Sequence, residues 1–272
     1  MNKSVAMIFM KRSTRTRVST ETGVALLGGH ALFLAPSDIQ LGVNESVRDT
    51  ASVLSRFNDV ILARVNETET IEELCKWSEK PVINALCDKY HPLQTLADLM
   101  TLEEKWGVGG VKGKTVSWVG DGNNVLHDLM VGTAMLGGNV SIATPKGYEP
   151  DADVVERCEE CMEVGGGKLK LTTVAAEAVE GADCVATDTW ISMGEEDQYD
   201  AKVAEFSGYQ ITESLLKNAN EQALFMHCLP RHEEEVDDEV FYGPRSVVWQ
   251  EAENRMWTVM AVIMSMQGKS VL

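Results

Sequence analysis

Short apolar segments alternate with amphipathic stretches along the whole chain. Apolar runs bounded by turn residues are typical of buried strands, and apolar residues recurring every three or four positions are typical of helices. Their alternation from end to end favours an α/β fold with parallel sheets. The predicted strands are 5–9, 31–34, 60–63, 82–85, 115–119, 140–143, 168–172, 184–187 and 223–226. The predicted helices are 14–27, 45–57, 71–78, 91–106, 125–136, 151–164, 175–179, 211–219 and 253–266.

A glycine-rich segment interrupts this series. The predicted helix at 91–106 runs into Gly107-Val108-Gly109-Gly110, and a second strand–helix series begins at residue 115. Glycine is common just beyond a helix end because it adopts the left-handed backbone found there. We therefore place the domain boundary at this segment, which separates residues 1–107 from residues 108–250. The last helix, in 251–272, is apolar on most faces and is expected to be well buried.

Composition narrows the possible ligands. The 272 residues are 44% hydrophobic and 24% charged, as in ordinary globular proteins, and no apolar run is long enough to span a membrane. The net charge of −18 argues against binding nucleic acid or an anionic membrane through a general field. An anionic ligand must therefore be held by a local basic cluster. The six cysteines lack the spacing of a disulfide scaffold, and Cys158 and Cys161 are read as neighbours on a helix, which favours a reducing compartment.

One basic cluster comes early, in residues 11–17 (KRSTRTR), where a predicted strand ends and a helix starts. Unpaired backbone N–H groups and the helix dipole favour an anion there. Ser13, Thr14 and Thr16 add hydroxyl donors, and the guanidinium of Arg15 fits phosphate oxygens. A Ser/Thr cap with solvated charges explains the pattern about equally well.

Other polar groups also follow predicted strands. Arg64 ends one of them, and His91 lies one helical turn from Gln94 at a helix start, where both side chains can donate to a carbonyl oxygen. A lone strand-end arginine is more often a surface residue, and a lone His-Pro is usually a cap. The turn Gly120–Asn124 resembles the front of a dinucleotide fingerprint but lacks its third glycine and a ribose-binding acid after the next strand. Its Asn amides suit a ligand carboxylate instead.

Two further clusters follow later strands. Asp188 is a natural anchor for an ammonium group, and His227 directly precedes Cys228, a pairing that can indicate a nucleophile but often misleads. Both clusters, like the earlier ones, fall at the carboxyl ends of predicted strands or at the helix starts beyond them. Open α/β sheets bind their ligands at this edge.

Together these stretches resemble the carbamoyltransferase family over essentially the whole chain. Ser13-Thr14-Arg15-Thr16 matches the family's carbamoyl phosphate motif, and Arg64 with His91-Pro92-Leu93-Gln94 matches its other carbamoyl phosphate contacts. Asp188, Ser192-Met193-Gly194 and His227-Cys228-Leu229-Pro230 look like the ornithine branch. The similarity continues through Arg255. Family members usually have a further helical region before the first strand, which this chain lacks.

The resemblance implies two doubly wound parallel-sheet domains. Residues 1–107 would bind carbamoyl phosphate, residues 108–250 would bind ornithine, and the C-terminal helix of 251–272 would return to the first domain. The implied reaction moves the carbamoyl group of carbamoyl phosphate to the side-chain amine of ornithine, by direct acyl transfer without metal or cofactor. It also implies a homotrimer in which Gln40 reaches the phosphate site of a neighbouring subunit.

The resemblance further implies a role for each matched residue. Arg15, His91, Asp188 and Cys228 are the expected catalytic residues. Carbamoyl phosphate would contact Ser13, Thr14, Arg15, Thr16, Gln40, Arg64, His91, Gln94, Cys228, Leu229 and Arg255. Ornithine would contact Asn123, Asn124, Asp188, Ser192 and Met193. We also expect a cis Leu229–Pro230 bond, with Cys228 facing the interdomain cleft beside Asp188 and helping the attacking amine to lose its proton.

Several alternatives remain open at this point. Another transcarbamoylase could act on putrescine, N-acetylornithine or aspartate, although aspartate would require a basic residue in place of Asp188. A dehydrogenase that binds NAD and an inactive interaction protein are alternatives of other classes. The chain resembles eukaryotic members of the family, which implies the mitochondrial matrix, although no transit segment is evident; a prokaryotic member would be cytoplasmic.

Overall fold

The computed structural model describes residues 2–191 and 199–268 and divides the chain into two compact units. Unit 1 comprises Met1–Ala97 and Ala252–Leu272, and unit 2 comprises Asp98–Glu251. The division falls inside a helix, α4 (Pro92–Trp106), upstream of the glycine-rich segment after Trp106. The first turn of this helix contributes Leu93 to the core of unit 1.

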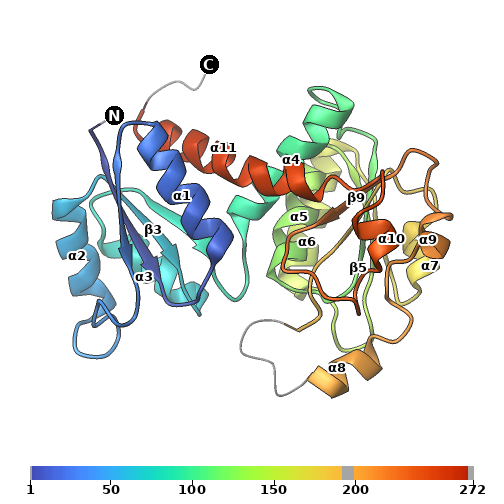
Figure 1. Ribbon diagram of the computed structural model, residues 1–272, viewed down its shortest axis with the longest axis horizontal. Helices are drawn as coiled ribbons and strands as arrows, with labels where there is room; N and C mark the ends of the chain where they lie inside the picture. Colours follow the sequence, from blue (N-terminus) through green and yellow to red (C-terminus); the bar gives the residue numbers. More distant parts are fainter. Residues whose placement is uncertain (1, 192–198, 269–272) are drawn as a thin grey trace. The chain divides into compact units, whose positions relative to one another are not determined.

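Unit 1 is a four-stranded parallel sheet in the order β2-β1-β3-β4 (Figure 1). Its strands are β1 (Ser4–Phe9), β2 (His30–Leu34), β3 (Val60–Arg64) and β4 (Val82–Leu86). Helices α1 (Thr14–Leu26) and α11 (Val248–Met266) cover one face, where Val24 and Ile263 join the core formed by alternate strand residues. Helices α2 (Val47–Phe57) and α3 (Thr68–Trp77) cover the other face.

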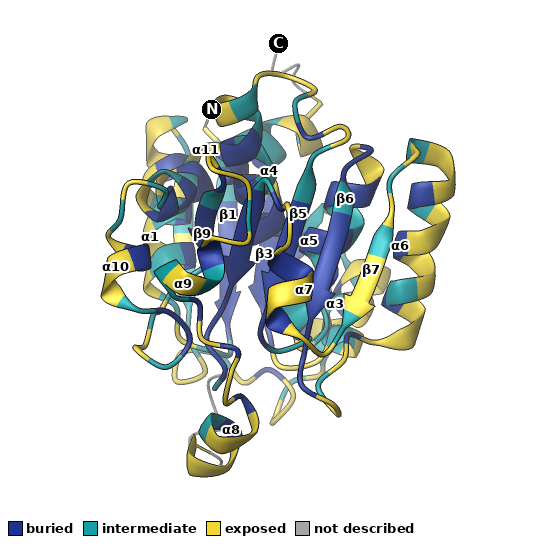
Figure 2. Ribbon diagram, turned by 90° about the vertical axis from the view of Figure 1, so that its right-hand side faces the viewer, coloured by how far each residue is buried: buried dark blue, intermediate teal, exposed yellow. Residues whose placement is uncertain are grey.

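Unit 2 is a five-stranded parallel sheet in the order β7-β6-β5-β8-β9. Its strands are β5 (Thr115–Val119), β6 (Asn139–Ala143), β7 (Leu169–Thr172), β8 (Cys184–Thr187) and β9 (Leu224–His227). Its other helices are α5 (Asn124–Met135), α6 (Ala152–Gly165), α7 (Ala175–Val179), α8 (Tyr199–Glu205), α9 (Glu213–Leu216) and α10 (Asp238–Phe241). Figure 2 shows β5 and β6 buried, whereas the edge strand β7 and the outer side of α6 are exposed.

Strand order creates one reversal point in each sheet. In unit 1 the chain runs outward from β1 to β2 and then returns to place β3 on the other side of β1, with Phe9 opposite Arg64. In unit 2 it runs outward from β5 through β6 to β7 and returns to place β8 beside β5. Ligands of doubly wound sheets bind beyond the carboxyl ends of the strands at such a reversal. The predicted α/β class with two parallel sheets is confirmed.

Four helices differ clearly from the sequence-based prediction. Helix α11 begins at Val248 and not at residue 253, because Val248 is fully buried in the core of unit 2. The predicted helix at 211–219 is reduced to the short α9. Two short helices, α8 and α10, were not predicted. The buried side chain of α8 is Lys202, paired with Asp121 at 3.2 Å, so this helix has no apolar periodicity to reveal it.

All six cysteines are free, and Cys158 and Cys161 lie on α6, as predicted. Within residues 2–191 and 199–268, no helix combines the length and apolar character that crossing a membrane requires.

Candidate active site

In unit 1 the site is built around the start of α1. Ser13 caps this helix, because its side chain accepts a hydrogen bond from the backbone N–H of Thr16 at 3.2 Å. The first turn contains no acidic residue and instead carries Arg15, which is half-buried. A basic first turn opposes the helix dipole. The basic first turn of α1 therefore does not stabilise the helix by itself, but it suits the binding of an anion.

Four polar side chains near this helix start are almost completely buried in unit 1: Arg64, His91, Gln94 and Arg255. Arg255 donates through Nη2 to Oγ1 of Thr16 at 2.9 Å and through Nη1 to Oε1 of Gln94 at 2.6 Å. The C-terminal helix α11 thereby ties the start of α1 to the first turn of α4. The geometry thus joins Thr16, Gln94 and Arg255, all three of which were predicted as site residues.

His91 is held in its neutral form. Burial lowers the pKa of its imidazole well below the usual value, and the positive charges of Arg255, Arg64 and Arg15 lower it further. A neutral imidazole keeps one N–H that can donate to a carbonyl oxygen without itself carrying charge. Unit 1 therefore concentrates cationic and neutral hydrogen-bond donors in a chain whose net charge is −18. This combination suits a phosphate joined to a carbonyl group.

In unit 2 the site begins at the turn between β5 and α5. Asn123 caps α5: its Oδ1 accepts from the N–H groups of Val125 and Leu126, at 3.0 and 3.2 Å. Its Nδ2 donates to Oδ2 of Asp188 at 3.1 Å. The turn needs glycine at Gly122, where a Cβ would lie 2.5 Å from the backbone between Tyr148 and Pro150. Asn123 thus links the ends of β5 and β8.

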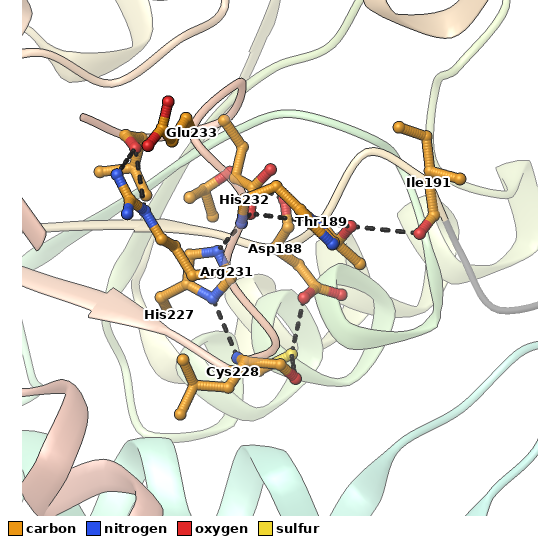
Figure 3. A network of polar contacts seen from close by, with 12 residues as sticks. Asp188, Thr189, Ile191, His227, Cys228, Arg231, His232 and Glu233 are labelled. Atoms are coloured by element: carbon orange, nitrogen blue, oxygen red, sulfur yellow. Dashed lines mark hydrogen bonds and ion pairs between the residues drawn. The ribbon is translucent and has the colours of Figure 1, made fainter. Parts of the chain in front are cut away.

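Cys228 contacts the same carboxylate from the end of β9. Its thiol donates to Oδ1 of Asp188 at 2.8 Å, and Figure 3 shows the two side chains pointing toward one another. Burial, together with the negative charge of Asp188, raises the pKa of Cys228 well above its ordinary value. Burial also raises the pKa of Asp188. The predicted cis Leu229–Pro230 bond and the pairing of Cys228 with Asp188 are both confirmed.

A second layer of polar contacts around Cys228 was not predicted from the sequence. The ring of His227 accepts from the backbone N–H of Leu229 at Nδ1, 2.9 Å away, and its Nε2 lies 3.2 Å from Oε1 of Glu235. Glu235 also accepts from the backbone N–H of His232, and the ring of His232 contacts Thr189 Oγ1 at 3.2 Å (Figure 3). Only the adjacency of His227 to Cys228 signalled this layer; Glu235 is hidden in a run of three glutamates.

Several predicted site residues are not joined to these clusters by the contacts described. Gln40 is exposed on the loop before α2, and its Oε1 accepts from Nδ2 of Asn44 at 2.8 Å. Asn124 is half-buried as the first residue of α5. Ser192 and Met193 lie outside the described residues. In the described part of the chain, no group of three or more His, Cys, Asp or Glu side chains is arranged to hold a metal ion.

Comparison with known proteins finds one family for both parts of the chain. Residues 1–104 match the model described as aspartate/ornithine carbamoyltransferase, carbamoyl-P binding domain. Residues 112–266 match the model described as aspartate/ornithine carbamoyltransferase, Asp/Orn binding domain.

Curated relatives and solved structures agree with this assignment. The mitochondrial ornithine carbamoyltransferase of Aquarana catesbeiana is 53% identical over 97% of this chain and 75% of its own length. The mitochondrial ornithine transcarbamylase of Gallus gallus is 54% identical over 97% and 74%. Among solved structures, ornithine carbamoyltransferase from Pyrococcus furiosus is 47% identical with a TM-score of 0.95, covering 99% of this chain and 86% of that one.

The buried carboxyl of Glu235 predicts how stability depends on pH. Burial raises its pKa from 4.5 to about 7. Between these values the folded chain holds a proton that the unfolded chain has released, so this contribution to stability is present at low pH and is lost as pH rises through about 7. Glu235→Gln should remove it. Urea unfolding should show the wild-type advantage over this variant shrinking from pH 4.5 to 7.

The matched control for this experiment is Glu233→Gln, because the Glu233 side chain is exposed. It should leave the pH slope of unfolding unchanged. Parallel pH profiles for wild type and Glu235→Gln would contradict the raised pKa.

Proposed function

The chain belongs to the aspartate/ornithine carbamoyltransferase family, and from this premise we propose that it converts carbamoyl phosphate and L-ornithine to L-citrulline and phosphate. The proposal is supported by the different polar groups that are buried in the two units. Buried cationic and neutral donors gather in unit 1, while a buried carboxylate, Asp188, ends β8 in unit 2. The first set suits carbamoyl phosphate, and the carboxylate suits an ammonium group.

Unit 1 supplies the carbamoyl phosphate half of the site. The phosphate would occupy the start of α1 at Ser13–Thr16, with Arg64 as a further contact. His91, Arg15 and Thr16 would polarise the carbonyl and stabilise the oxyanion of the tetrahedral intermediate. Gln94 would bind the carbamoyl amide. Arg255 supports this arrangement by holding Thr16 and Gln94 in register.

Unit 2 supplies the ornithine half. Asp188 would pair with an amine of ornithine, with Asn124, Ser192 and Met193 contacting the amino-acid end. Because Asn123 is already bonded to Asp188 and to the start of α5, its main contribution would be to orient that carboxylate.

Proton transfer falls to Asp188 in this proposal. The side-chain amine of ornithine is protonated at neutral pH and must lose a proton before it attacks. A buried carboxylate with a raised pKa is a stronger base than an exposed one. The Cys228 thiol, whose own pKa is raised, would remain protonated and donate to Asp188.

The bond changes then balance without a cofactor. The neutral amine attacks the carbonyl carbon, the C–O bond to phosphate breaks, and its electron pair leaves with the phosphate. The nitrogen gives up its second proton as the intermediate collapses, and the phosphate takes it up.

The physiological setting is also part of the proposal. Relatives named as mitochondrial support the mitochondrial matrix as the compartment. By resemblance, the active species would be a homotrimer in which Gln40 completes the phosphate site of a neighbouring subunit. The Gln40 side chain is exposed, which supports a contact with a neighbouring subunit.

The substrate assignment is tested by measuring citrulline formation from carbamoyl phosphate. Ornithine should support turnover, whereas putrescine and N-acetylornithine should not give their carbamoylated products at a comparable rate. Putrescine lacks the carboxylate, and N-acetylornithine lacks the free α-amine. Faster product formation with either amine would reassign the substrate within the family.

The phosphate site is tested by Arg15→Ala. Removing a donor aimed at developing charge costs roughly 2.7–4 kcal/mol of transition-state stabilisation, so kcat should fall about 100- to 1,000-fold. Arg17→Ala is the matched control on the same helix, because Arg17 is exposed, bonds Glu21 and stacks on Phe33. Its kcat should stay near wild type. Near-normal steady-state kinetics for Arg15→Ala would remove the proposed cradle.

Sharing of sites between subunits is tested by mixing two inactive variants. Gln40→Ala and Arg15→Ala should each lose activity alone. If Gln40 serves a neighbour, hybrids formed by unfolding and refolding them together contain some sites with both native residues and recover activity. Light scattering should show three chains per particle. Recovery would be absent if Gln40 acted within its own chain, and an active monomer would also contradict the proposal.

A further inference from the structure

His227 lies at the carboxyl end of β9, with its imidazole fully enclosed in unit 2. The backbone N–H of Leu229 donates to its Nδ1 at 2.9 Å. A ring nitrogen that accepts a hydrogen bond carries no proton, so Nδ1 holds a lone pair. The other nitrogen, Nε2, must then carry the hydrogen, and it donates to Oε1 of Glu235 at 3.2 Å.

Leu229, the residue held by this ring, has an uncommon backbone conformation. Its φ is +64°, in the left-handed region that residues with a side chain normally avoid. Within residues 2–191 and 199–268, Asn2 is the sole other non-glycine residue with a positive φ. Such a conformation persists where surrounding contacts hold it, and these positions gather at functional sites. The Leu229 N–H to His227 Nδ1 bond is one such contact.

Cys228 lies between these two residues. Its thiol reaches Oδ1 of Asp188 at 2.8 Å, and the direction of the side chain follows from the backbone on either side of it. On the preceding side, the backbone N–H of His227 donates to Oε2 of Glu251 at 3.0 Å. On the following side, the Leu229 N–H is held by the ring. Both flanks of Cys228 are therefore fixed by buried groups.

We propose that His227 is a positioning residue that works as a fixed, neutral hydrogen-bond acceptor. Its Nδ1 holds Leu229 in the left-handed conformation and so aims Cys228 at Asp188, while Glu235 selects the required tautomer through Nε2. His227 transfers no proton in the reaction. The effect of His227 on kcat rests on the proposed function. The assignment of the hydrogen to Nε2 of His227 rests on the hydrogen-bond geometry and is independent of that function.

The charges around His227 act against a neutral ring. Four acidic side chains lie near His227: Glu235 and Glu251 bond the residue itself, Asp188 bonds the adjacent Cys228, and Asp98 lines a small pocket together with His227. Negative neighbours favour a protonated, cationic imidazole. Protonation at Nδ1 would, however, place two N–H groups against each other at the Leu229 contact.

Two isosteric substitutions separate the two ring nitrogens. Asn places its amide oxygen near the position of Nδ1, so His227→Asn keeps an acceptor for Leu229 and loses the bond to Glu235. Gln reaches the position of Nε2, so His227→Gln keeps a donor to Glu235 and loses the acceptor. Each variant gives up one buried hydrogen bond, so their stabilities should fall by similar amounts.

Their kinetics should differ. Misplacement of a reacting group by about 1 Å can cost on the order of 100-fold in rate. We expect kcat for citrulline formation to fall about 100-fold in His227→Gln and to remain within about tenfold of wild type in His227→Asn. Equal kcat losses in the two variants, or the reverse order, would overturn the positioning role.

A spectroscopic measurement tests the tautomer without substrate or turnover. The chain has five histidines, and the His227 ring resonances are those that disappear in His227→Asn. In ¹⁵N-labelled wild type, these signals should show protonated Nε2 and unprotonated Nδ1 throughout the pH range of activity. A protonated Nδ1, in either the neutral or the cationic ring, would overturn the inference. Absence of wild-type citrulline formation would instead contradict the proposed function and leave the tautomer result intact.

Discussion

Parallel strands that end at one edge of a sheet bring distant parts of the chain together, and the polar cluster of each unit depends on this constraint. In unit 1, β1 and β3 lie side by side although β2 separates them in sequence, so the segment that leads from Phe9 into α1 begins next to Arg64. In unit 2, β5 and β8 are neighbours across the same kind of reversal, so Asn123 reaches Asp188. Strand order thus determines which polar residues of the chain come together in each unit.

Burial then determines what each group can do. Removing a charge from water disfavours its ionised form, and neighbouring charges add to that effect or oppose it. His91 becomes a neutral donor because burial and three arginines act in the same direction. Asp188 becomes a stronger base because burial, the largest effect on its pKa, outweighs the groups that lower it. The same carboxylate helps to keep Cys228 as a thiol. A cysteine in this environment is suited to donate a hydrogen bond and not to act as a thiolate nucleophile.

Sequence patterns predicted the α/β class, each of the nine described strands and the polar residues that follow them, because apolar runs and strand-end polar groups are local signals. They did not predict α8, whose buried residue is Lys202, or the true start of α11 at Val248, since tertiary packing decided both. Nor did they predict the contacts of Glu235 with His227 and His232. A glutamate within Glu233-Glu234-Glu235 looks solvated, and only the fold shows that it is 1% exposed.

The contacts of Asp188 show how neighbouring residues fix the position of a buried carboxylate. Asp188 has a fixed donor on each oxygen: Asn123 from the β5 turn and Cys228 from β9. Each donor is itself fixed through backbone N–H groups. Asn123 accepts from the N–H of Val125 as the cap of α5, and the N–H groups of His227 and Leu229, on either side of Cys228, donate to buried side chains. In the proposed role, a carboxylate held in this way would lose little freedom on pairing with an ammonium group, so less of the binding free energy would be spent on ordering it. Burial is the largest effect on the pKa of this fixed carboxylate and raises it, which suits the proposed role as a base.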